Sequence, residues 1–409
     1  MSKRIVLLAV VCTTVAGLAA SAAATATPER TVAKASKSML IGINDEANTL
    51  YGDPDQAFAT LQSLRAQVLR VNLYWGGSKY AVANKKPRDA TDPGDPNYNW
   101  AIYDRLVRYA TQYNVKVMFS ILFTPKWANG GKARTVAPTI GKTLHDFAYA
   151  AAVRYSGFWT APVWQQDPSN SASALPLPKV SLWTAWNEPN NPIWLSPQYK
   201  RVGTKWRVES ARQYAKICNA VYTGIHDVLI SPDRGKLANQ VACGVTGPKG
   251  NNAPGTSRAS VDPVTFLTQA KRFGMKTFDV YAHHPYADKG NEPPSYVPKG
   301  RFLRRIQLGN INILLAALSK LYGPKHLWIT EYGYQTDPPD KTIFGTSWRN
   351  QAKYMSQAIA IARKNPRIDM FLWFLIKDEP RMGGWQSGLE TVGGRKKPSW
   401  NVFRAIPRS

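Results

Sequence analysis

Two glutamates stand at the ends of apolar, strand-like segments and could perform acid–base chemistry together. Glu188 follows the run KVSLWTAW, with Asn187 before it, and Glu331 ends the run LWITE. An amide or a carboxylate is costly to bury without a partner, so such groups at the end of an apolar run indicate a site. Glu188 alone could be an ion-pair partner. Two carboxylates on one face, however, can cleave a glycosidic bond, because one protonates the leaving oxygen and the other attacks the anomeric carbon or positions water there.

Eight apolar segments of strand length could position these two glutamates. Apolar residues between them recur at helical spacing, as at Tyr103, Leu106 and Ala110. Continuously apolar strands separated by helices predict a parallel sheet with helices outside it. Eight such units favour an α/β fold of the (β/α)8 TIM-barrel type over an open doubly wound sheet. The predicted strands are 38–44, 68–75, 116–122, 180–187, 241–246, 277–286, 327–334 and 369–376.

A barrel would bring both glutamates to one face, since the fourth and seventh strands end at the same rim. The motifs TPKWA, WNEPN, HHPY and WITEYGY resemble those of the retaining glycoside hydrolases of clan A. They are most similar to family 39 and its relatives, and next to family 5. The resemblance covers nearly the whole chain after the leader. It implies that Glu188 is the acid/base, that Glu331 is the nucleophile, and that Asn187 contacts the sugar 2-hydroxyl.

The same resemblance implies roles for four further residues. Arg70 in LRVNLYW would hold the nucleophile ionised, His284 and Tyr286 in HHPY would lie beside the carboxylates, and Trp373 in FLWF would lie under the sugar ring. Three of them also have a structural alternative: Arg70 could belong to a structural ion pair, His284 could be a core histidine, and Trp373 could only pack in the barrel. An arginine and a tyrosine hydroxyl would favour the charged nucleophile, whereas an acid with fewer donors would keep its proton.

Three other tryptophans are weaker candidates for the site. Trp75, Trp127 and Trp194 could stack on sugars or could only fill loops. No metal and no organic cofactor is expected. The neighbouring His283 and His284 would point to opposite faces of a strand, which does not make a zinc site.

The first residues have the pattern of a secretory leader. Two basic residues precede an apolar run over 5–20 and then small residues, which predicts a cleaved signal peptide over 1–26 and a spacer over 27–38. A membrane anchor is disfavoured because the run is short for a span, and a lipoprotein anchor because Cys12 lies deep inside the run and not after a small residue at its end. The protein is expected to be extracellular, with one catalytic domain over 39–409. Its remaining cysteines, Cys218 and Cys243, could form a disulfide or stay as buried thiols.

The chain is strongly basic, with 53 Lys and Arg against 26 Asp and Glu, a net charge of +27. This excess is compatible with an anionic substrate, but the charges are spread along the chain, which favours a solvated basic surface. No nucleic-acid-binding module is recognisable. We therefore expect a secreted, monomeric, retaining glycoside hydrolase acting on a β-linked polysaccharide or oligosaccharide. The alternatives are a non-catalytic carbohydrate-binding barrel and a basic surface-binding adhesin.

Overall fold

The computed structural model describes residues 38–166, 168–169, 171–231 and 235–408. The predicted signal peptide and all of the predicted spacer except Ser38 lie outside the described residues. Within the described ranges, no helix is long and apolar enough to cross a membrane.

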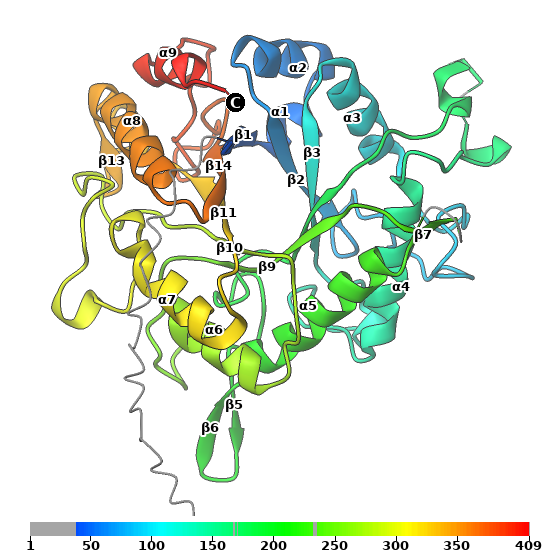
Figure 1. Ribbon diagram of the computed structural model, residues 1–409, viewed down its shortest axis with the longest axis horizontal. Coiled ribbons are helices and arrows are strands. Elements are labelled where there is room, and N and C mark those ends of the chain that lie inside the picture. The colour runs from blue at the N-terminus through cyan, green and yellow to red at the C-terminus, as the bar shows by residue number, and fades with distance from the viewer. Residues whose placement is uncertain (1–37, 167, 170, 232–234, 409) are drawn as a thin grey trace, which may run out of the picture. The chain divides into compact units, whose positions relative to one another are not determined.

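Eight parallel strands close into a barrel (Figure 1). Six of them lie within the predicted segments, and β9 and β14 each begin one residue earlier than predicted. Their order around the barrel is β1-β14-β11-β10-β9-β4-β3-β2. The (β/α)8 architecture is thereby confirmed. It places the carboxyl ends of all eight strands at one rim. The strands are β1 (Leu40–Asn44), β2 (Val68–Tyr74), β3 (Lys116–Leu122), β4 (Leu182–Ala185), β9 (Gln240–Thr246), β10 (Val280–His283), β11 (Leu327–Tyr332) and β14 (Ile368–Phe374).

Helices surround the strands (Figure 1). Asp53 and Asp262 cap α2 and α6, each followed by a proline in the first turn, and Ser347 caps α8. The helices are α1 (Glu46–Thr49), α2 (Pro54–Ser63), α3 (Ala101–Gln112), α4 (Gly141–Arg154), α5 (Glu209–His226), α6 (Pro263–Arg272), α7 (Ile311–Tyr322), α8 (Trp348–Lys364) and α9 (Pro398–Ala405), with 3₁₀ turns at Lys126–Ala128, Val163–Gln165, Ser171–Ala174, Gly300–Phe302 and Leu308–Asn310.

The core has two apolar clusters, because successive strand residues face opposite sides of the barrel wall. On β14, Met370 and Leu372 belong to the cluster inside the barrel. Their neighbours Phe371 and Trp373 belong to the larger cluster that packs toward the helices. This alternation decides which side chains at the rim can reach the site.

Several short strands outside the barrel were not predicted. After β4, a hairpin of β5 (Tyr199–Val202) and β6 (Lys205–Val208) projects from the barrel (Figure 1). Its sequence is largely polar, so the apolar-run criterion missed it. The others are β7 (Leu229–Ser231) with β8 (Gly235–Lys236), and β12 (Gln335–Thr336) with β13 (Gly345–Thr346).

A disulfide joins Cys218 in α5 to Cys243 in β9, with Cα atoms 5.8 Å apart and 25 positions between them in sequence. The sequence left open whether these cysteines form a disulfide or stay as buried thiols, and the structure contains the disulfide. Because closing a loop of this length restricts the unfolded chain, replacing both cysteines by alanine should lower the free energy of unfolding by about 3 kcal/mol. Denaturant unfolding of the double variant measures this. Two reactive thiols at these positions in the unfolded, unreduced protein would contradict the bond.

Candidate active site

A cleft of about 860 Å³ opens at the rim formed by the strand ends. Both candidate carboxylates, Glu188 and Glu331, line it, together with Asn187 and Tyr286. The cleft is bordered by loops that follow several different strands. Polar groups from segments far apart in sequence therefore converge on one open space, as in a ligand-binding cleft.

Glu331, near the end of β11, accepts hydrogen bonds from three side chains. Arg70 Nη1 lies 2.6 Å and Asn44 Nδ2 3.1 Å from its Oε1, and the Tyr286 hydroxyl lies 3.2 Å from its Oε2. Burial, and then the charge of Glu331, raise the pKa of Tyr286 well above its usual value, so this hydroxyl keeps its proton and donates. Both oxygens of the Glu331 carboxylate are thus held by donors, one of which is an arginine.

Arg70 contacts residues from both segments that carry the candidate carboxylates. Its guanidinium is 1% exposed, and it donates from Nη2 to Asn187 Oδ1 at 2.7 Å and from Nε to Ser120 Oγ at 2.8 Å. The Arg70 guanidinium thus orients both the Glu331 carboxylate and the side-chain amide of Asn187. The structure brings together the charged pair expected from the sequence.

Glu188 lies three residues beyond β4 and has two side-chain donors. Its Oε1 is 3.0 Å from His284 Nδ1, and its Oε2 accepts from Asn191 Nδ2 at 3.1 Å. The other ring nitrogen of His284 lies 2.9 Å from Thr330 Oγ1, which fixes the ring. Glu188 thus has fewer donors than Glu331, as the sequence led us to expect.

The protonation of Glu188 differs from the expectation. Burial raises the pKa of Glu188, but the hydrogen bond and charge of His284, with the Asn191 amide, outweigh burial and lower the pKa below its usual value. His284 contacts the carboxylate, so the smaller number of donors does not by itself keep the proton on Glu188. The cause is that His284 is completely buried and directed at the carboxylate, not packed in the core.

The two carboxylates lie close together across the cleft. His284 Nδ1 is 3.6 Å from Glu331 Oε2, and one ligand atom each from Glu188, His284 and Glu331 lie within 4.8 Å of one another. Among the described residues, this is the one group of three His, Cys, Asp or Glu side chains near enough to hold a metal ion. Because Glu331 is already paired with Arg70, and Glu188 with His284, we interpret the group as two carboxylates bonded to neighbouring side chains and not as a metal site.

The backbone at the rim is strained where it carries the site. Trp186, Glu188, Val245 and Leu375 have φ angles of 73°, 35°, 46° and 82°, in the left-handed region. Such conformations cost about 1–3 kcal/mol each for residues with a side chain, and the surrounding structure must hold them. Here each lies at or just beyond the end of a barrel strand, where the chain turns to direct side chains into the cleft.

Two positions that sequence analysis missed hold Glu188 in place. Gly247 packs so closely that a Cβ atom there would lie 2.9 Å from the Cδ of Glu188. Asn190 is completely buried and bridges the loop after β4 to the loop after β9, accepting from the Gly247 amide at 2.9 Å and donating to the Val261 carbonyl at 3.0 Å. Asn190 directly follows WNEP and Gly247 directly follows the strand segment VACGVT, and neither has another sequence signal.

Trp373, expected under the sugar ring, lies outside the cleft. It is completely buried among the residues that pack toward the helices, and its indole donates to the Ser387 carbonyl at 2.9 Å. The reason is strand parity: Phe374, one residue later, lines the cleft. Trp385, from the loop after β14, also lines it and is 40% exposed, with its ring 5.4 Å from that of Tyr286.

The three weaker tryptophan candidates divide between core and cleft. Trp75 is completely buried against Phe147 and Trp127, so it is core. Trp127 donates to the Ala83 carbonyl at 2.7 Å and does not line the cleft. Trp194 lines the cleft and stacks on a phenylalanine, with ring centroids 5.7 Å apart. Only the last remains a candidate for contact with a sugar.

A third carboxylate, Glu46, lines the cleft just after β1. It accepts from the Asn72 amide nitrogens and from the hydroxyls of Tyr74, at 2.9 Å, and Tyr51, at 3.3 Å. Burial raises the pKa of Glu46 despite these bonds. Sequence analysis missed this residue, which lies in the polar segment after LIGIN.

Comparisons with known proteins support the fold. No family model matches the chain, and no curated protein matches it in sequence. Solved structures with a similar fold include a family 39 glycoside hydrolase from Bacteroides cellulosilyticus (16% identity, TM-score 0.54), a glucosidase from Croceicoccus marinus (13%, 0.60) and a fungal β-1,4-galactanase (14%, 0.53). Each match covers 90% of this chain, and 62%, 66% and 99% of those chains, respectively. The expected resemblance to glycoside hydrolases is confirmed at the level of fold.

Proposed function

We propose that the chain is a secreted, retaining glycoside hydrolase that cleaves a β-glycosidic bond in a polysaccharide or oligosaccharide. Glu331 is the nucleophile and Glu188 the acid/base. Asn187, held by Arg70, is placed to contact the sugar beside the nucleophile. Tyr286 and Asn44 donate to the nucleophile, and Phe374, Trp385 and Trp194 supply apolar surface in the cleft.

The separation of the two carboxylates carries this proposal. Retaining enzymes hold their carboxyl groups about 5–5.5 Å apart, whereas inverting enzymes leave about 6.5–9.5 Å for a water molecule between the carboxylate and the sugar. An oxygen of Glu188 and an oxygen of Glu331 lie within 4.8 Å of each other. This distance supports direct attack by Glu331 and a covalent glycosyl-enzyme.

The mechanism has two displacements. In the first, Glu331 attacks the anomeric carbon while Glu188 gives its proton to the leaving oxygen, so the glycosidic bond breaks as the glycosyl-enzyme bond forms. In the second, Glu188 removes a proton from water, which attacks the same carbon and releases Glu331. Two inversions give net retention. The Arg70 guanidinium orients the nucleophile at the start and contacts the released carboxylate again at the end.

The contact between His284 and Glu188 predicts an acidic pH optimum. Because the first step needs protonated Glu188, kcat/KM falls as pH rises through the pKa of this residue, which His284 lowers. For substrates with poor leaving groups, the decline should therefore begin below neutral pH. His284→Gln removes the imidazole, so it should raise this pKa and shift the descending limb to higher pH. A descending limb that stays in place, or shifts to lower pH, would show that His284 does not tune Glu188.

A panel of poly- and oligosaccharides tests the proposed activity. The wild-type protein should release new reducing ends from at least one β-linked glycan, and Glu331→Ala should release none. Binding without turnover in both proteins would favour the non-catalytic carbohydrate-binding barrel. Binding to polyanions of any kind, with no preference for glycans, would favour the basic adhesin.

A further inference from the structure

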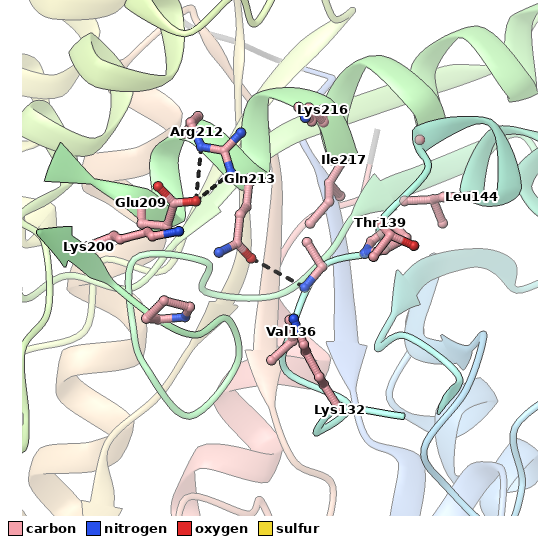
Figure 2. A pocket seen from close by; sticks show the side chains of 14 residues that line it. Lys132, Val136, Thr139, Leu144, Lys200, Glu209, Arg212, Gln213, Lys216 and Ile217 are labelled. Carbon is pink, nitrogen blue, oxygen red and sulfur yellow. Dashed lines mark hydrogen bonds and ion pairs between the residues drawn. The ribbon is translucent and has the colours of Figure 1, made fainter. Parts of the chain in front are cut away.

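A second pocket lies outside the cleft, between the first turns of α4 and α5 (Figure 2). Its volume is about 470 Å³, and it is lined by the segment 136–139 that follows β3, by Pro197 and Lys200 after β4, and by α5. Leu144 and Ile217 are buried beneath it. The Gln213 side chain reaches across it, and its Oε1 accepts from the Ala137 amide at 3.3 Å.

The rim of this pocket carries unpaired positive charge. Lys132, Lys200 and Lys216 line it and are exposed, and within the described ranges none of their ammonium groups forms an ion pair. The one carboxylate of the lining, Glu209, is paired with Arg212, as Figure 2 shows, and with Arg207. Burial raises the pKa of Glu209, but the two arginines outweigh burial and lower it, so the group stays ionised and neutralises only part of their charge.

The β5–β6 hairpin extends this charge beyond the pocket. Lys200 pairs with Arg207 and Val202 with Lys205 across its ladder, so these four side chains share one face of the hairpin. Like charges directly opposite each other destabilise a hairpin. The segment 199–208 nevertheless has four cations and no acidic residue, and its Trp206 is 46% exposed. Such a row of cations suits a ligand with repeated negative charges.

One loop connects this basic surface to the cleft. Ile193 and Trp194 line the cleft, whereas Pro197 and Lys200, a few residues later, line the second pocket. The two spaces therefore border the same segment between β4 and α5. A long glycan that occupies the cleft can continue over this segment.

We propose that the pocket and the hairpin form a second, non-catalytic binding site for an acidic polysaccharide; this inference rests on the proposed glycosidase function. The cations would contact carboxylate groups along the chain, and the aliphatic floor would contact the C–H faces of its sugars. A nucleic acid is the less favoured polyanion, because the site exposes a single tryptophan and not a series of aromatic rings on which bases could stack.

Binding of polygalacturonate, a carboxylated polysaccharide, tests the site. The variant Lys132→Gln/Lys200→Gln/Lys205→Gln/Lys216→Gln removes four exposed ammonium groups that form no ion pair with any residue that the structure describes. The matched control removes four exposed lysines elsewhere, with the same loss of charge, as Lys276→Gln/Lys320→Gln/Lys353→Gln/Lys364→Gln. Dissociation constants are compared at about 50 mM salt for polygalacturonate, neutral β-1,4-galactan and single-stranded DNA.

The first variant should bind polygalacturonate about tenfold more weakly or worse, and the control should bind within about threefold of the wild type. Equal losses in both variants would overturn the site, because only total charge would then matter. DNA binding as tight as polygalacturonate binding would overturn the assignment to an acidic glycan. If the lysine variant binds polygalacturonate as tightly as the wild type, and the wild type hydrolyses glycans, the second site alone is refuted. If the lysine variant binds more weakly as expected, but the wild type hydrolyses no glycan, the glycosidase function alone is refuted.

Discussion

Replacing Glu331 by alanine should lower hydrolysis of any glycoside substrate by about 10⁴-fold or more, since the carboxylate that forms the covalent intermediate is then missing. Azide should restore turnover of an activated aryl glycoside, because a small anion fits the space that the carboxylate leaves. The glycosyl azide should then have inverted configuration, as it arises from a single displacement.

The Glu331→Ala variant leaves the buried Arg70 without its carboxylate, which is expected to destabilise the fold. Glu331→Gln keeps a hydrogen-bond acceptor for Arg70 and is the variant with which to check folding by thermal unfolding. Glu379→Gln is the matched control, because Glu379 lines the same cleft and, among the residues that the structure describes, accepts from the Trp385 backbone amide and not from Arg70, Asn44 or Tyr286. It should keep activity within about tenfold. A comparable loss in Glu379→Gln, or a folded Glu331→Gln that remains active, would contradict the assignment of the nucleophile.

Replacing Glu188 by alanine should give a loss that depends on the leaving group. For poor leaving groups, which need protonation, kcat/KM should fall by about 10²–10⁴-fold. For a dinitrophenyl glycoside, which leaves without a proton, formation of the glycosyl-enzyme should be nearly normal, and its hydrolysis should become rate-limiting. Azide should then accelerate turnover and give a product of retained configuration, because Glu331 still performs the first displacement.

The leaving-group dependence separates the two glutamates. Asn191→Ala removes the other hydrogen bond to the Glu188 carboxylate but keeps the acid itself, so it is the matched control and should show the same relative loss for good and poor leaving groups. If Glu188→Ala lost activity equally on all substrates, or if azide gave the inverted product, Glu188 would not be the acid/base.

The barrel could be predicted from sequence because its strands are buried on both faces and therefore appear as apolar runs. The paired glutamates could be placed at the rim for the same reason, since each follows or ends such a run, whereas Arg70 lies inside β2 and was assigned from the resemblance alone. Asn44, the last residue of β1, carried the same signal, as a polar side chain at the end of LIGIN, and was not used.

The remaining parts of the site depend on contacts that a sequence does not display. The resemblance implies that Trp373 lies under the sugar ring, but the alternation along β14 turns this residue to the outside and brings Phe374 into the cleft. Gly247 and Trp385 come from loops whose packing is set by distant segments. The lowered pKa of Glu188 likewise follows from His284, 96 positions away.

Proton NMR of the wild-type reaction, recorded before the product mutarotates, tests most directly whether Glu331 acts as a nucleophile across the short gap from Glu188. The first sugar released should have the same anomeric configuration as the substrate. A first product of inverted configuration would contradict it, because Glu331 would then have to act as a base toward water and not as the group that attacks the sugar.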